Sequence, residues 1–89
     1  MSVSVGGAGV RRDDVLVGLA EIVHLVTERP VTEVRPERTF VDDLRIDSLA
    51  MVEILEGAAT HFDVRIEDEA AKDFVRVSDL VDYVAARVG

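Results

Sequence analysis

Apolar residues recur at helical spacing along three stretches of this 89-residue chain, and no convincing alternation of apolar and polar residues is present. An amphipathic helix needs an apolar group every three or four positions, whereas a half-buried strand needs one at every second position. The first stretch covers residues 13–27, and its apolar stripe consists of Val15, Leu16, Leu19, Ile22, Val23 and Val26. The pattern therefore predicts an all-α fold, and a chain of this length has room for one domain.

A second helix is predicted over Ser48–Phe62, with Asp47 placed to act as its N-cap. One side of this helix is assigned to the core and carries Met51, Leu55, Ala58 and Phe62. The opposite side is assigned to solvent and carries Leu49, Val52, Glu53, Glu56 and Thr60. Two apolar residues, Leu49 and Val52, thus stand on an otherwise polar face.

The C-terminal third of the chain predicts one short and one longer helix. Residues 67–73 have room for one or two helical turns, and a final helix covers about residues 77–88 with Ser78 as a candidate cap. Its inward positions are Val77, Leu80 or Val81, Val84 and Val88, and its outward positions are Asp79, Asp82 and Arg87.

A long connection, residues 28–47, separates the first two main helices, and Pro30 and Pro36 break regular structure in it. Such a connection in a small domain needs apolar anchors, which we assign to Phe40 and Leu44. The prediction is a small four-helix bundle of three main helices and one short helix, with a long first loop. Residues 1–10 are small and rich in glycine, so we expect a flexible leader before a domain formed by residues 11–89.

The composition excludes several classes of protein. Without cysteine there are no disulfides or thiolate sites, and two histidines, His24 and His61, are too few for a typical zinc centre. A net charge of −8 argues against nucleic-acid binding and predicts protein partners with basic surfaces. No apolar run is long enough to cross a bilayer and the start lacks a signal-peptide pattern, so we expect a cytoplasmic monomer.

The segment with the most chemical information is residues 40–49, where Ser48 begins an amphipathic helix and acidic residues precede it. The start of a helix offers unpaired N–H groups and partial positive charge, so an anion attached to Ser48 would be tolerated there. Leu49 and Val52, beside acidic groups, resemble a small docking patch. Two ordinary explanations stay open: Asp-Ser before an apolar run is a common helix start, and these two residues could pack under the long loop.

Residues 42–54, Asp-Asp-Leu-Arg-Ile-Asp-Ser-Leu-Ala-Met-Val-Glu-Ile, resemble the attachment motif of acyl carrier proteins. The chain is most similar to the type II fatty-acid-synthase carriers of actinobacteria, over about residues 13–88. Residues 62–69 and 81–84 match the family's spacing without a gap. The Asp-Ser-Leu triplet alone is a weak signal, whereas the triplet at a helix start in a small acidic chain with these later landmarks is a strong one.

The resemblance implies that a transferase joins 4′-phosphopantetheine from coenzyme A to Ser48 through a phosphodiester. The thiol of this cofactor holds acyl groups as thioesters and shuttles them between enzymes of fatty acid biosynthesis, so the chain is a carrier and not an enzyme. The family typically holds the acyl chain between its helices. The implied partners are the phosphopantetheinyl transferase and acyl-chain synthesising enzymes with basic docking surfaces. Recognition of them is assigned to Asp42, Asp43, Asp47, Leu49, Val52, Glu53 and Glu56.

The chain departs from the family pattern at several positions near this motif. Arg45 stands where glycine or an acid is usual, Glu56 where an apolar residue is frequent, and Glu67 where proline is common. Residues 59–61 replace a stretch that is usually more acidic. These changes leave the attachment chemistry intact but bear on the choice of partners, so a carrier for a polyketide or another secondary metabolite stays an alternative.

Three readings from other classes are weaker. A serine hydrolase would need a converging His and acid, and Ser48 lacks the Gly-x-Ser-x-Gly elbow. A calcium module could draw ligands from Asp42, Asp43, Asp47 and Glu53, but their spacing does not fit an EF-hand loop. An acidic helical interaction module without a prosthetic group would keep the acidic face and have no need of Ser48.

Overall fold

The computed structural model describes residues 12–88, and all regular elements within this range are helical. They are, in chain order, α1 (Arg12–Thr27), the 3-10 helix η2 (Val31–Glu33), α2 (Ser48–Phe62), α3 (Asp68–Ala71) and α4 (Val77–Arg87). The predicted all-α bundle of three main helices and one short helix is confirmed. The single turn η2 was not predicted, because three residues are too few to show a periodicity. The expected leader, residues 1–10, lies outside the described residues.

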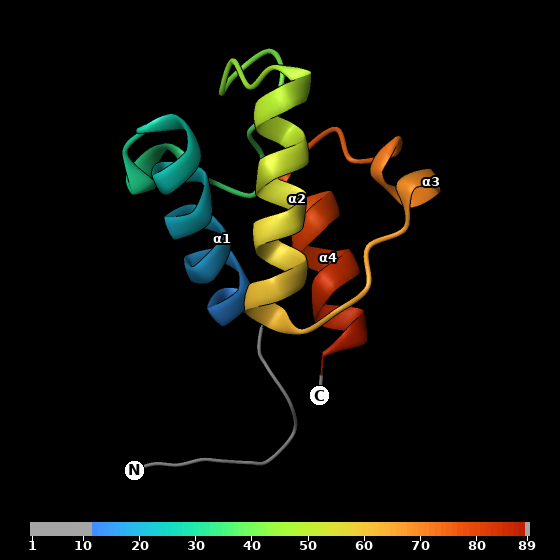
Figure 1. Cartoon of the computed structure of the whole chain (residues 1–89). Helices are drawn as coiled ribbons and strands as arrows, with labels where there is room; N and C mark the ends of the chain where they lie inside the picture. The colour runs from blue at the N-terminus through green and yellow to red at the C-terminus, as the bar shows by residue number, and fades with distance from the viewer. Residues whose placement is uncertain (1–11, 89) are drawn as a thin grey trace, which may run out of the picture.

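Of the three main helices, α1 is the one that packs against both of the others, α2 and α4. Helix α1 runs antiparallel to α2 and α4 and contacts both, while α3 stands on the side of α2 away from α1 (Figure 1). The long loop closes the end of the bundle at which α1 ends and α2 begins (Figure 1). Within residues 12–88, no helix is long and apolar enough to cross a membrane.

The core lies between α1, α2 and α4. Its most deeply buried helical side chains are Val15, Leu19, Val23, Ile54, Val77, Leu80 and Val84. The predicted inward face of α4 is confirmed. For α2 the prediction was partly wrong, because Ile54 is fully buried while Met51, Leu55 and Phe62 are only half-buried. The reason is that α1 packs against the Ile54–Ala58 line of α2, whereas Met51 and Leu55 turn toward a pocket formed with the long loop and the segment around α3.

The long loop is held in place by buried apolar side chains and by backbone hydrogen bonds. Phe40 and Leu44, the predicted anchors, are each 1% exposed, and Val34 and Ile46 are buried as well. Three backbone hydrogen bonds join the loop to the start of α4 and the residue shortly before it: Phe40 N–H donates to Val75 O, Val77 N–H to Arg38 O, and Ser78 N–H to Pro36 O. The loop is therefore an ordered part of the fold, which is what a connection of this length requires.

The start of α4 differs from the prediction. Ser78 is the second residue of the helix and not its cap, and the cap position is Arg76. The Asp79 carboxylate takes the capping role, because Oδ2 accepts from the backbone N–H of Val75 at 3.0 Å and of Arg76 at 2.9 Å. The N–H of Ser78, which has no partner within the helix, donates to the Pro36 carbonyl of the long loop at 2.9 Å.

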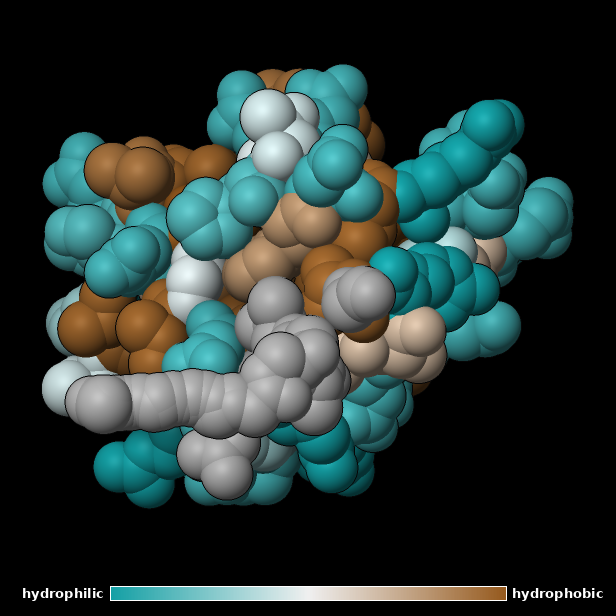
Figure 2. Space-filling view, turned by 90° about the horizontal axis from the view of Figure 1, so that it is seen from below, coloured by the Kyte–Doolittle hydropathy of each residue, from teal (hydrophilic) through white to brown (hydrophobic). Residues whose placement is uncertain are grey.

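Gly18 weakens helix propensity in α1, and the packing explains why it is there. A Cβ at this position would lie 2.7 Å from Phe62 Cζ of α2, so glycine permits the two helices to approach closely. The end of the bundle near this contact is rimmed mostly by hydrophilic side chains, with apolar groups visible on the flank where α1 lies (Figure 2). Val17 and Leu25 are the exposed large apolar residues of α1.

Candidate functional site

Ser48 is the first residue of α2 and its side chain is exposed. The preceding Asp47 has an extended backbone, and its Oδ1 accepts from the N–H of Ala50 at 2.8 Å. The predicted N-cap is thus confirmed, and it fixes the point at which the backbone enters the helix. Because Asp47 supplies the capping oxygen, the hydroxyl of the neighbouring Ser48 is not needed as a cap.

The Ser48 hydroxyl forms no hydrogen bond with any side chain or backbone group of residues 12–88. No histidine or carboxylate in this range is held against it as a base, so the arrangement lacks the elements of a serine nucleophile in an enzyme. It does offer an accessible oxygen next to the positive end of a helix dipole, where a covalently attached anion is favoured. These are properties of an attachment point.

A pocket of about 380 Å³ opens beside Ser48. Its walls are mostly apolar and come from the long loop, α2 and the segment around α3. The lining residues are Phe40, Val41, Ile46, Asp47, Ser48, Met51, Val52, Leu55, Ala71, Lys72 and Phe74. The half-buried Met51 and Leu55, which the sequence placed in the core, are therefore walls of this pocket.

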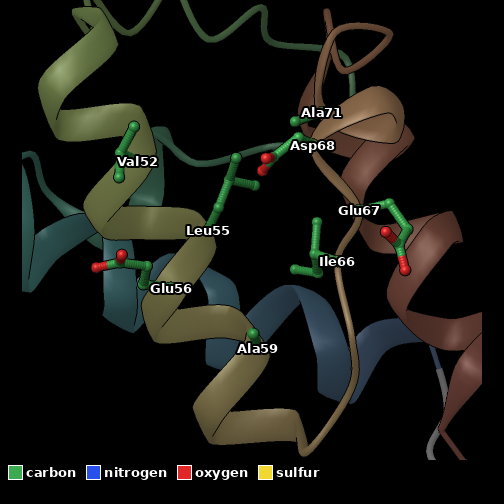
Figure 3. A pocket seen from close by; sticks show the side chains of 8 residues that line it. All are labelled: Val52, Leu55, Glu56, Ala59, Ile66, Glu67, Asp68 and Ala71. Atoms are coloured by element: carbon green, nitrogen blue, oxygen red, sulfur yellow. The ribbon is translucent and has the colours of Figure 1, made fainter.

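A second pocket of about 180 Å³ continues along α2 and shares Val52, Leu55 and Ala71 with the first. Figure 3 shows Leu55 and Ile66 pointing into the gap between α2 and the α3 segment, while Glu56 and Glu67 point away from it. Two departures from the family pattern, Glu56 and Glu67, thus lie at the rim of one pocket. Together the two pockets form an apolar groove that begins at Ser48.

The predicted outer face of α2 is confirmed. Leu49 is 72% and Val52 50% exposed, so neither is covered by the long loop, and Glu53 and Glu56 are exposed as well. Val41, at 68% exposure, adds an apolar side chain to the pocket rim that the sequence reading did not single out. Its place in the loop has no periodicity from which exposure could be inferred.

Of the acidic residues before Ser48, Asp42 is exposed and Asp43 has a local structural role as well. Asp43 Oδ2 accepts from the Thr39 N–H at 2.8 Å, and its own N–H donates to Thr39 Oγ1 at 2.9 Å. The backbone hydrogen bond from Thr39 is the main cause that lowers the pKa of the Asp43 carboxyl, and the charges of Arg38 and Arg76 act in the same direction.

Arg45 has a backbone φ of 57°, in the left-handed region that favours glycine. This geometry gives a physical reason for a glycine at the position in related chains. The arginine side chain is exposed at the loop end that leads into α2. The departure at position 45 therefore places a cation near Ser48 at a conformational cost.

No group of three or more His, Asp or Glu side chains within residues 12–88 is arranged to hold a metal ion, which weighs against the calcium reading. His24 is an exposed residue whose Nδ1 contacts Arg29 O at 2.9 Å. His61 packs edge-on against Phe62 in the last turn of α2. Neither histidine lines the Ser48 pocket.

The sequence pattern of the phosphopantetheine attachment-site family matches residues 18–84. The acyl carrier protein of Acidothermus cellulolyticus is 46% identical over 74 residues, which cover 83% of this chain and 88% of that relative. The acyl carrier protein of Thermobifida fusca is 48% identical over 71 residues, covering 80% and 90% respectively. A solved structure of the Enterococcus faecalis acyl carrier protein has a TM-score of 0.72 at 27% identity and covers 88% of this chain and 99% of its own.

Proposed function

Because the chain belongs to the phosphopantetheine-binding family of acyl carrier proteins, we propose that Ser48 is the residue that carries its 4′-phosphopantetheine. The observation that carries this assignment is the exposed Ser48 hydroxyl at the start of α2, free of hydrogen bonds within residues 12–88 and beside an apolar pocket. The other serine of the described residues, Ser78, is half-buried inside α4 and lines a different pocket.

The attachment step transfers a phosphoryl-linked group from coenzyme A. A bond forms between Ser48 Oγ and the phosphorus that bears the pantetheine, and the bond from that phosphorus to the bridging pyrophosphate oxygen breaks. Adenosine 3′,5′-bisphosphate leaves, and the hydroxyl proton passes to a base of the transferase or to solvent, since no side chain of residues 12–88 is hydrogen-bonded to the Ser48 hydroxyl. A phosphodiester attached to Ser48 would lie at the positive end of the α2 dipole, where an anion is favoured.

When bound, the cofactor supplies the thiol on which acyl groups are held as thioesters. The chain's own contribution is the apolar groove along α2, whose walls include Met51, Leu55 and Ile66. Each methylene that an acyl chain buries there is stabilised by about 0.8 kcal/mol relative to water. The groove is open at its rim, so a cargo would be protected while loaded and still able to leave.

The outer face of α2 is the proposed docking surface. Leu49 and Val52 provide exposed apolar contacts, and Asp42, Asp47, Glu53 and Glu56 surround them with negative charge. Such rim charges mainly accelerate association with a basic surface and are screened by salt. Fast and weak binding suits a carrier that must leave each enzyme after one step.

The partners proposed for this surface are the phosphopantetheinyl transferase and enzymes that synthesise fatty acyl chains, the usual role of the family. Carriers of this family do not catalyse a reaction, and we propose the same for this chain. We further propose that it acts as a monomer in the cytoplasm, since coenzyme A must be available to load Ser48. Cargo from a polyketide pathway is the alternative that the departures at Arg45, Glu56 and Glu67 favour.

Incubation with a promiscuous phosphopantetheinyl transferase and coenzyme A tests the assignment by intact-protein mass. We expect the mass to rise by one phosphopantetheine group in the wild type and in the matched control Ser78→Ala, and to stay constant in Ser48→Ala. A gain in Ser48→Ala would move the attachment point elsewhere, and no gain in the wild type would favour an unmodified interaction module. Mass analysis of the chain from its own host then distinguishes fatty acyl from other cargo.

A further inference from the structure

Lys72 is the one cation among the described residues that line the Ser48 pocket. It lies immediately after α3, and its Nζ is 3.3 Å from Glu69 Oε2. Both side chains of this pair are largely exposed, at 71% and 87%. An exposed pair at this spacing contributes little, so the ammonium group is free to move to a better-placed anion.

Helix α3 is weakly held in place. It has four residues and none of them is buried, and a helix this short is marginal by itself. Its start is attached through the Tyr83 hydroxyl, which lies 3.4 Å from both Glu67 N and Arg65 O. A small additional attraction at the Lys72 end is therefore enough to change how firmly the segment is held.

The proposed modification changes the charge at the pocket mouth. A phosphodiester on Ser48 adds one negative charge between Asp47 and the apolar wall, in a chain that already carries −8. Asp47 and Lys72 are the charged residues of the described pocket lining, and only Lys72 can neutralise the new charge. Phosphate oxygens are strong acceptors for an ammonium group.

We propose that Lys72 is a positioning residue for the loaded carrier, in which its ammonium group exchanges Glu69 for the phosphodiester on Ser48. This proposal rests on the proposed attachment at Ser48. The new pair draws the C-terminal end of α3 toward the start of α2 across the pocket. Loading thereby makes the α3 segment, which forms one wall of the groove, less mobile. The unloaded and loaded carriers then present different surfaces to their partners.

Amide hydrogen exchange measured by NMR on unloaded and loaded protein tests this proposal, after mass has confirmed loading. The relevant amides are those of Ala71, Asp73 and Phe74, which bond to backbone carbonyls at 3.0–3.2 Å in and after α3. At low ionic strength we expect loading to slow their exchange about two- to five-fold, the range for one partly exposed ion pair. At about 1 M salt, where the screening length is about 3 Å, the difference disappears.

Three variants separate this pairing from a general structural role. Lys72→Gln abolishes the slowing, and Lys72→Arg restores it because the positive charge is kept. The matched control is Arg65→Gln. It removes an exposed cation that lies 2.8 Å from Glu67, near the other end of α3 and outside the Ser48 pocket. We expect this variant to leave the slowing of amide exchange unchanged. The phosphorus-31 resonance of loaded protein shifts in Lys72→Gln but not in Arg65→Gln.

Equal slowing in wild type and Lys72→Gln would overturn the proposal, and so would a loaded wild type with unchanged exchange. Both results would leave the attachment at Ser48 intact, because the mass gain reports on it separately. If the wild type gains no mass, the proposed attachment at Ser48 is refuted. The proposed pairing of Lys72 with the phosphodiester is then refuted as well, because it depends on that attachment.

Discussion

Replacing Arg45 with glycine should stabilise the protein, although it removes a side chain at a loop next to the functional site. Arg45 has a φ of 57°, and its side chain is exposed. A non-glycine residue in the left-handed region costs about 1–2 kcal/mol. Glycine also gains freedom in the unfolded chain, which offsets about 0.4–1 kcal/mol of that relief. The net stabilisation of the folded state is on the order of 0.5–1 kcal/mol.

The comparison that isolates this backbone effect is Arg45→Gly against Arg45→Ala. Both variants remove the same charge, and only glycine relieves the strained conformation. Urea denaturation should give Arg45→Gly the higher midpoint with an unchanged slope, and a difference of this size raises the melting temperature by about 2–8 °C in a domain of this length. If the two variants had the same free energy of unfolding, the strain assigned to position 45 would be refuted.

Three further predictions concern the core, a loop carboxylate and the net charge. Ile54→Ala should lower the free energy of unfolding by about 2–5 kcal/mol in urea denaturation, because the side chain is fully buried, whereas the exposed Leu49→Ala should change it by less than about 0.5 kcal/mol. Folding lowers the pKa of the Asp43 carboxyl, so its charge stabilises the fold above the unfolded pKa of about 3.9, and this contribution is lost as the pH falls through the folded pKa. The difference in free energy of unfolding between wild type and Asp43→Asn should therefore be largest near neutral pH and disappear in acid. A difference that does not change with pH would contradict this prediction. The melting temperature should rise with added NaCl or Mg²⁺, because ions relieve the self-repulsion of a net charge of −8, and a melt insensitive to both would count against it.

The helices could be predicted from the sequence because their information is local. The bounds of α2, from Ser48 to Phe62, follow from the cap at Asp47 and the apolar spacing, and the structure has the same bounds. The anchors Phe40 and Leu44 were found because they are large apolar residues in a mostly polar connection, although Ile46 and Val34, which are buried as well, were not assigned this role.

The features that escaped prediction depend on contacts between distant segments. Ile54 is fully buried because α1 packs against its side of α2, and the helical stripe of α2 does not contain that information. Ser78 is not the cap of α4, because the helix begins one residue earlier and the Asp79 carboxylate accepts the N–H groups that precede it. Lys72 lines the Ser48 pocket because of where α3 lies in the fold. The order of charges along the sequence does not contain this information, so no role could be assigned to Lys72 from the sequence.

The hydrogen bonds between the long loop and residues 75–78 have a consequence for synthesis of the protein. The loop cannot take its final form until residues 75–78 have left the ribosome, because its backbone bonds to that segment. A nascent chain would thus expose the serine before its surroundings exist. We expect the transferase to load Ser48 only after residues 75–78 have emerged and bonded to the loop, so that folding of this segment precedes loading.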